Sequence, residues 1–193
     1  FEETYADLCY LLEKPLKKGP NKKEQNIVLE KFESILNGHV VQKDKKFYLN
    51  VNGAGKFEMG LVSEGYRKLA TIMYLIQSDS LNKNSVIFWD EPESNMNPKM
   101  IWPIAKALRE LAYMGVQIFV STHSYFVQQA FDLLAREGKV SDIKFFSLYR
   151  DDDTGQLCAE IADFVSDLQH NAVMEEFDAI YDREQDSFYQ DYN

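Results

Sequence analysis

Hydrophobic residues recur at two different spacings along the first third of the chain. In residues 1–36 they lie three or four positions apart, with a break at 14–23, and this spacing predicts two helices. Residues 38–57 alternate between apolar and polar side chains around a turn at Asn52 and Gly53, which predicts a short β-hairpin or meander. The lysines of the break fit either a solvated turn or a basic patch for a nucleic-acid backbone.

Helical periodicity and continuous apolar runs alternate over the next ninety residues. The predicted order is a helix over 63–76, a strand over 86–89, a helix over 98–114, a strand over 116–120, a helix over 124–136 and a strand over 143–149. The strands contain few polar residues, so we expect burial on both faces. Alternating strands and helices form βαβ units, and the expected fold class is therefore α/β, with a mainly parallel sheet flanked by helices.

The last segment, residues 175–193, contains seven acidic residues and one basic residue. Its apolar residues lie on one face of a predicted helix: Met174, Phe177, Tyr181, Phe188 and Tyr192. We expect this aromatic face to be buried and the acidic face to be solvated. A docking helix for a partner protein is the alternative.

Length, charge and cysteine content restrict the class of protein. The 193 residues fit one domain, or a large part of one, at about 100–200 residues per domain. A formal net charge of −10 argues against a chain that coats nucleic acid by itself, although a local basic patch remains open. Two cysteines suit a reducing cytosol, and no apolar run reaches the roughly 18–20 residues that span a bilayer. We expect a cytoplasmic protein without a membrane segment.

Two adjacent carboxylates follow the first apolar run. Asp90 and Glu91 stand at the carboxyl end of the 86–89 strand, and ligands bind at this end of the strands in open parallel sheets. One carboxylate there can hold Mg²⁺, and the next can polarise an attacking water. An ordinary acidic turn is the alternative, but adjacent carboxylates repel each other unless a cation is present.

Two further polar positions accompany these carboxylates. His123 follows the 116–120 strand, one βαβ crossover after Glu91, so we expect its imidazole near that carboxylate; a structural histidine is the alternative. Ser63 is a natural N-cap for the 63–76 helix. Its hydroxyl, the bare backbone of Gly65 and the helix dipole together make an anion site, with an ordinary cap as the alternative.

In this order and spacing, the three motifs resemble the ATP-binding-cassette (ABC) class of P-loop ATPases, and SMC, RecF and OLD heads more than transporters. Residues 62–67 are similar to the signature motif, which contacts the γ-phosphate of ATP on the opposite protomer. Residues 87–91 are similar to Walker B, residues 94–97 to the D-loop and His123 to the switch histidine. The resemblance implies these roles: Asp90 as Mg²⁺ ligand, Glu91 and His123 in catalysis, and Ser63, Glu64, Gly65, Arg67 and Asn97 in ATP binding.

The sequence departs from this family pattern at several positions. The signature begins with Val62 instead of Leu and has Glu64 in place of a glycine, and Asn97 replaces the D-loop aspartate. Residues 52–57 superficially resemble Walker A, but they lack its first glycine and its Ser/Thr, and a hairpin turn fits them better. The resemblance therefore implies the C-terminal lobe of an ABC-type ATPase, whose Walker A lobe precedes Phe1. The expected domains are a joining segment over 1–60, the ATPase lobe over 61–150 and an acidic helical extension over 151–193.

Residues 60–70 and 88–98 also resemble prokaryotic AAA-type ATPases, many of which serve anti-phage systems such as Septu and retron sets, where a PtuA-like ATPase accompanies an HNH nuclease. The implied function is hydrolysis of ATP with Mg²⁺ by a homodimer that controls a nuclease effector, with nucleic acid bound through the complex. The alternatives are a DNA-repair or chromosome-maintenance head and a non-hydrolysing, ATP-gated scaffold.

Overall fold

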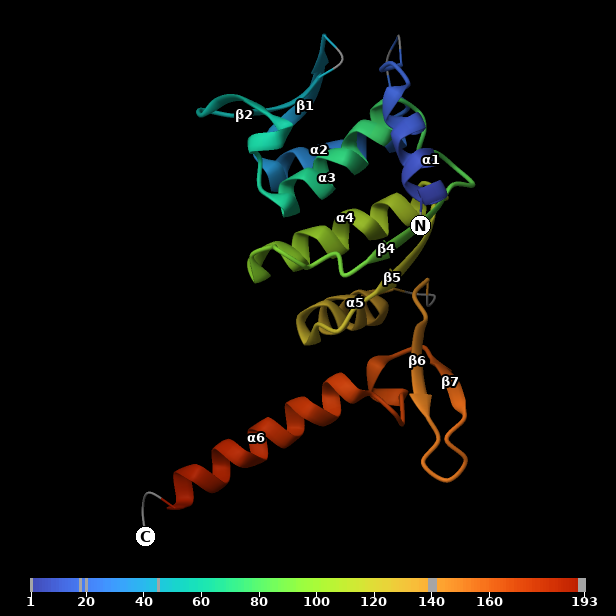
Figure 1. Cartoon of the computed structure of the whole chain (residues 1–193), viewed down its shortest axis with the longest axis vertical. Coiled ribbons are helices and arrows are strands. Elements are labelled where there is room, and N and C mark those ends of the chain that lie inside the picture. Colours follow the sequence, from blue (N-terminus) through green and yellow to red (C-terminus); the bar gives the residue numbers. More distant parts are fainter. Residues whose placement is uncertain (1, 18, 20, 45, 139–141, 191–193) are drawn as a thin grey trace. The chain divides into compact units, whose positions relative to one another are not determined.

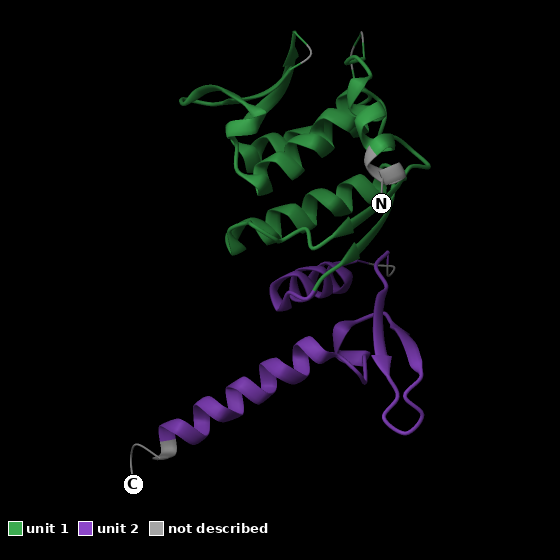
Figure 2. Ribbon diagram, viewed as in Figure 1, with its two compact units in different colours: residues 1–122 green, residues 123–193 purple. Residues whose placement is uncertain are grey.

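The computed structural model describes residues 2–17, 19, 21–44, 46–138 and 142–190 (Figure 1). It divides into two compact units, residues 1–122 and residues 123–193 (Figure 2). The first unit contains most of the predicted motifs, and the second begins at His123. The expected division at residues 60 and 150 remains a prediction.

A layer of helices forms the core of the first unit. Helices α2 (Lys23–Leu36), α3 (Glu64–Gln77) and α4 (Ile101–Tyr113) pack together, and α1 (Glu2–Glu13) contacts α3 (Figure 1). Their apolar residues recur at three- and four-residue spacing, which lines one face of each helix. The largest fully buried side chains of these helices are Val28, Phe32, Leu36, Leu69, Met73, Tyr74, Ile76, Leu108 and Leu111. The helical predictions for residues 1–36, 63–76 and 98–114 are confirmed.

A three-stranded antiparallel meander follows α2. Its strands are β1 (Gly38–Lys43), β2 (Lys46–Val51) and β3 (Gly55–Glu58). The turn between β2 and β3 contains Gly53 at φ 76°, a left-handed conformation that glycine adopts without steric cost. The residues that superficially resemble Walker A therefore form a turn and a strand, as predicted, and are followed by a short 3₁₀ helix, η1 (Met59–Leu61).

Strands β4 (Val86–Asp90) and β5 (Gln117–Ser121) pair in parallel, with Asp90 opposite Ser121 at the carboxyl end. The prediction that these strands are buried on both faces was wrong. The side chains alternate in exposure, and Phe88 is 79% exposed and stacks on Phe119 with ring centroids 4.9 Å apart. Helix α4 contacts β5 and covers one face of the two-stranded sheet, whereas the face that carries the stacked rings is open within this unit.

The second unit contains helix α5 (Tyr125–Glu137), strands β6 (Phe145–Arg150) and β7 (Leu157–Ala162), the 3₁₀ helix η3 (Val165–Asp167) and helix α6 (Ala172–Gln190). The expectation that the third strand joins a parallel sheet was wrong, because β6 pairs antiparallel with β7 through the 151–155 turn. Burial on both faces was wrong here too, since Phe146 and Leu148 are exposed. The α/β class is confirmed, with parallel pairing between β4 and β5.

Helix α6 confirms the predicted C-terminal helix but not the burial of its aromatic face. Phe177, Tyr181 and Phe188 are 45%, 55% and 59% exposed. Near its start, α6 contacts α5, and Phe177 stacks on Tyr125 with ring centroids 4.3 Å apart. Tyr192, the last residue of the predicted stripe, lies outside the described residues. In the part of the chain that the structure describes, no helix has the length and apolar character needed to span a membrane.

Candidate nucleotide site

The two carboxylates of the Walker B motif lie at the carboxyl end of β4, next to the end of β5. The Ser121 hydroxyl donates a hydrogen bond to Oδ1 of Asp90, and the Glu91 amide donates to the Ser121 carbonyl at 2.9 Å. Both carboxylates are exposed. The neighbouring strand therefore orients Asp90 through its side chain and Glu91 through its backbone, while the acidic groups remain open to a ligand.

Glu91 has a left-handed backbone conformation, with φ 43°. Such a conformation costs a residue other than glycine about 1–3 kcal/mol, and the surrounding structure has to maintain it. The turn that follows contributes, because the Ser94 amide donates to the Glu91 carbonyl at 3.1 Å. Strained backbone at the predicted catalytic base is consistent with a functional position.

Glu93 braces the loop after β4. Its Oε1 accepts a hydrogen bond from the Thr122 hydroxyl at 2.6 Å, which ties the loop to the end of β5. Its Oε2 is buried and has no hydrogen-bond partner among the described residues. Of the three carboxylates in this segment, Glu93 therefore faces the protein, and Asp90 and Glu91 face solvent.

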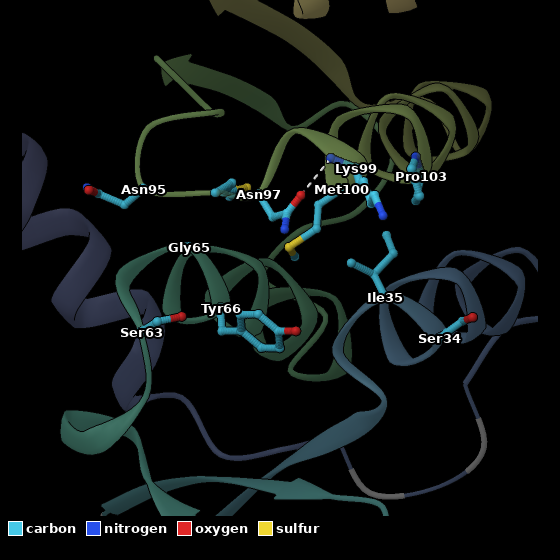
Figure 3. Close-up of a pocket in the computed structure, with 11 residues that line it drawn as sticks. Ser34, Ile35, Ser63, Gly65, Tyr66, Asn95, Asn97, Lys99, Met100 and Pro103 are labelled. Carbon is cyan, nitrogen blue, oxygen red and sulfur yellow. Dashed lines mark hydrogen bonds between the residues drawn. The ribbon is translucent and has the colours of Figure 1, made fainter.

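Ser63 occupies the N-cap of α3, as predicted, and its carbonyl accepts from the Arg67 amide at 3.0 Å. Its hydroxyl makes no capping bond within the described structure. Ser63 instead lines a cavity of about 510 Å³ between the start of α3, the loop after β4 and α2 (Figure 3). Eleven residues line this cavity: Ser34, Ile35, Ser63, Gly65, Tyr66, Asn95, Met96, Asn97, Lys99, Met100 and Pro103.

Gly65 is buried against the loop after β4. A β-carbon at this position would lie 2.7 Å from Cγ of Met96 and 3.0 Å from the Asn95 carbonyl oxygen. The adjacent Glu64 carboxylate accepts from the Asn95 side-chain amide at 2.7 Å. The structure thus explains the glycine at position 65 by packing as well as by an anion site, because the signature helix and the D-loop segment are in direct contact there.

The remaining predicted residues of the first unit have defined local roles. The Asn97 side chain accepts from the Lys99 amide at 3.0 Å and caps the 3₁₀ helix η2 (Pro98–Met100), a contact drawn in Figure 3. Arg67 has an exposed side chain, and its carbonyl accepts from the Thr71 hydroxyl at 2.9 Å. His123 is exposed and belongs to the second unit, so its proximity to Glu91 stays a prediction.

Lys68 was missed by sequence reasoning. Its ammonium donates to the Glu91 carbonyl at 3.2 Å and to the Ser94 hydroxyl at 2.7 Å, which joins the signature helix to the Walker B turn. Ser121 was also missed as the partner of Asp90. Polar residues that end a strand opposite a Walker B aspartate offered a signal for Ser121, but a lysine on an amphipathic helix offered none.

Comparison with known proteins places this site in a family. A family model described as "AAA domain, putative AbiEii toxin, Type IV TA system" matches residues 5–127, more than half of the chain. The chain belongs to this family of AAA domains. The match extends from α1 through the Walker B and D-loop segments to the first residues of α5. It supports nucleotide binding by an ATPase domain.

One curated relative and several solved structures resemble this AAA domain. The Old nuclease of Escherichia phage P2 is 37% identical over 62 residues, which are 30% of this chain and 11% of that protein. The SMC head domain from Thermotoga maritima matches with a TM-score of 0.51 at 15% identity, over 81% of this chain and 51% of that one. An SMC head domain from Pyrococcus furiosus, bound to the C-terminal domain of ScpA, matches with a TM-score of 0.52 at 11% identity, over 82% of this chain and 37% of that one. These structures confirm the expected fold of an ABC-type ATPase lobe. The AAA domain spans about half or less of each of these three proteins.

The chemistry of the donor groups fits Mg²⁺. Magnesium is usually held by one or two carboxylates, with substrate phosphates and water as its other ligands, and the AAA domain presents one oriented carboxylate, Asp90, beside the Ser121 hydroxyl. Within the described residues, no group of three or more His, Cys, Asp or Glu side chains forms a complete metal cage.

Proposed function

We propose that this AAA domain binds and hydrolyses ATP in a homodimer that holds ATP between its subunits. The observation that carries the proposal is the arrangement at the end of β4, where Asp90 and Glu91 are exposed, oriented by β5 and joined to the start of α3. In the proposal, Asp90 holds Mg²⁺, which neutralises phosphate charge when bound. Glu91 accepts the proton of the attacking water.

The start of α3 serves the nucleotide of the second copy. Its Ser63 hydroxyl is not used for capping, it lines an open cavity, and the first amides of a helix favour an anion. Glu64 takes part through its backbone amide, since its carboxylate is bonded to Asn95 and repels phosphate. Gly65 and Asn97 shape the cavity, and the exposed Arg67 provides positive charge.

His123 completes the catalytic set in this proposal. It stands two residues after β5, the strand whose end orients both Walker B carboxylates. An imidazole there can hydrogen-bond the γ-phosphate or the attacking water. The ATPase lobe of the proposal is residues 61–150, and the acidic extension is residues 151–193.

The dimer is proposed to control a nuclease effector in anti-phage defence, in the cytoplasm. Similarity to the Old nuclease supports a link between this ATPase type and nuclease activity. The family description, which names a toxin of a toxin–antitoxin system, supports a role in a defence-type module. An HNH-type nuclease is the proposed effector, with nucleic acid engaged through the complex.

Glu91→Gln in the complete natural protein tests the proposal. Loss of the base should lower ATP turnover about 10²-fold or more, while ATP binding and ATP-dependent dimerisation are retained. Glu24→Gln, an exposed change in the first turn of α2, is the matched control and should keep the parent rate. Equal ATPase rates for Glu91→Gln and the parent would contradict the catalytic assignment.

Mixing two inactive variants tests whether the signature motif acts across the dimer. In a mixed dimer of Ser63→Arg and Glu91→Gln subunits, one site combines both lesions and the other has neither, if each site takes its signature from the opposite subunit. Partial recovery of ATPase activity is then expected. If Ser63 serves its own subunit's nucleotide, both sites are damaged and mixing restores nothing. Full activity of the Ser63→Arg homodimer would exclude a role for this motif.

A further inference from the structure

The ammonium of Lys68 bridges two segments that are distant in sequence. Lys68 lies on the second turn of α3, is partly buried, and donates to the Glu91 carbonyl at 3.2 Å and to the Ser94 hydroxyl at 2.7 Å. Hydrogen bonds from a charged donor are roughly twice as strong as neutral ones. The side chain therefore fixes the Walker B turn against the signature helix of the same chain.

These contacts act on the backbone of Glu91 from one side. On the other side, the Glu91 amide is held by the Ser121 carbonyl at 2.9 Å. The two peptide groups that flank the Glu91 α-carbon are thus both anchored, and φ is held at 43°. Since the peptide planes determine where the β-carbon points, the direction of the Glu91 side chain depends on both anchors.

We propose that Lys68 is a positioning residue for Glu91, which holds the turn in the left-handed conformation that directs the carboxylate toward the attacking water. The inference rests on the proposed function, in which Glu91 is the catalytic base. Lys68 acts through the Glu91 backbone and the Ser94 hydroxyl, and has no part in binding ATP.

The alternative is that Lys68 only contributes to the stability of the fold. Both roles predict some loss of stability in Lys68→Met, so turnover has to be compared at equal amounts of folded protein. Lys31→Met is the matched control, because Lys31 also lies on a core helix and makes a contact between helices, an ion pair with Glu110 at 3.5 Å. A purely structural lysine should affect stability in the same way and leave turnover unchanged.

The experiment measures kcat, ATP affinity and thermal stability of Lys68→Met, Lys68→Arg and Lys31→Met in the complete natural protein. We expect Lys68→Met to lower kcat by about 10-fold or more with ATP affinity within about 2-fold of the parent, since a misplacement near 1 Å costs up to about 10²-fold. Lys68→Arg keeps the charge and the donors and should recover most of kcat. If Lys68→Met fails to fold, Ser94→Ala serves instead, because it removes one acceptor of the Lys68 ammonium. It should lower kcat by a smaller factor than expected for Lys68→Met and leave ATP affinity unchanged.

A double mutant separates this inference from the proposed function. In a Glu91→Gln background, Lys68→Met should change the residual rate by less than about 2-fold, because the group that Lys68 positions is already absent. An undiminished effect in that background, or parent kcat in Lys68→Met, would overturn the role of Lys68. Parent activity in Glu91→Gln alone would instead overturn the proposed base, whatever Lys68→Met does.

Discussion

A β-carbon on Gly65 would lie 2.7 Å from Cγ of Met96. This distance is below van der Waals contact, so the start of α3 and the loop after β4 approach more closely than any other residue type at position 65 allows. The Asn95 carbonyl, 3.0 Å from the same point, adds a backbone obstacle that side-chain rotation cannot remove. The glycine of the signature segment is therefore needed for packing inside one chain.

Gly65→Ala should lower the free energy of unfolding by about 1–3 kcal/mol, the usual cost of overpacking. The direction of this change is informative. Alanine forms helices better than glycine, so at a helix position with free space around it the same substitution would raise the free energy of unfolding. Urea denaturation checks it. Gly60→Ala is the control, since a β-carbon there would have no atom of the described residues within 4 Å apart from its own chain neighbours. Combining Gly65→Ala with Met96→Ala should give a loss smaller than the sum of the single losses, and simple additivity would contradict the contact.

Ser121→Ala should raise the Mg²⁺ concentration at which the ATPase rate is half-maximal. Nucleotide binding in the absence of metal should stay unchanged. The hydroxyl of Ser121 donates to Asp90, and loss of such an outer partner typically lowers metal affinity by about 10–100-fold. A titration of Mg²⁺ against ATPase rate in the complete protein measures the shift. An unchanged half-saturating Mg²⁺ concentration would show that Ser121 does not orient the metal ligand.

Because of Asp79, the free energy of unfolding should decrease as the pH falls into the acidic range. Partial burial acts to raise its pKa, but hydrogen bonds from Lys17 and from Gln25, at 3.3 and 2.8 Å, outweigh burial and hold the pKa below the ordinary 3.8. A carboxylate with a lowered pKa stabilises the fold fully above the unfolded value and loses this effect as pH falls through the folded value.

The difference in unfolding free energy between the parent and Asp79→Asn should therefore be largest near neutral pH and shrink below about pH 3.8. Asparagine tolerates the left-handed backbone of this residue, at φ 58°, so the substitution tests the charge. Asp44→Asn, at φ 52° in an exposed turn, is the matched control. A difference that stays constant from pH 6 to pH 3 would refute the effect.

Asp132 should be the most sensitive polar position of the second unit. Its side chain is only 8% exposed, accepts from the Val165 amide at 2.8 Å and pairs with Arg136 at 2.6 Å. Asp132→Ala should cost about 2–3 kcal/mol of stability, because it removes charged hydrogen bonds and leaves a buried amide unpaired. Glu176→Ala, which removes an exposed ion pair with Arg183, should cost under about 0.5 kcal/mol by the same denaturation assay.

The sequence predicted the helices, the strands and the positions of the motifs better than the burial and the contacts of individual side chains. Asp90 and Glu91 were placed at a strand end because an apolar run followed by carboxylates is a local pattern. The contact from Lys68 to Glu91 joins residues 23 positions apart, and nothing in an amphipathic helix marks which lysine bends inward. Phe88 was predicted to be buried because apolar runs are typical of central strands, yet its exposure depends on how many strands and helices surround it.

The second unit shows the same limit. The strand over 143–149 was predicted from its apolar run, but the return strand β7 was not, since LCAEIA is a weak alternating pattern. Without β7, the strand β6 was assigned to a parallel sheet. The pairing partner of a strand is a non-local property, and a missed neighbour changes the predicted topology even when the strand itself is correct.

At position 91, the residue type that gives the most stable fold differs from the one that the proposed chemistry requires, because the backbone of Glu91 is left-handed. Glycine or asparagine adopts φ 43° at lower cost, so Glu91→Gly and Glu91→Asn relieve strain while they remove the proposed base. A library at position 91 that is screened for heat resistance would therefore enrich inactive proteins. Under the proposed function, the strain at residue 91 is the cost of turnover, and thermostability is then a misleading guide for engineering at this position.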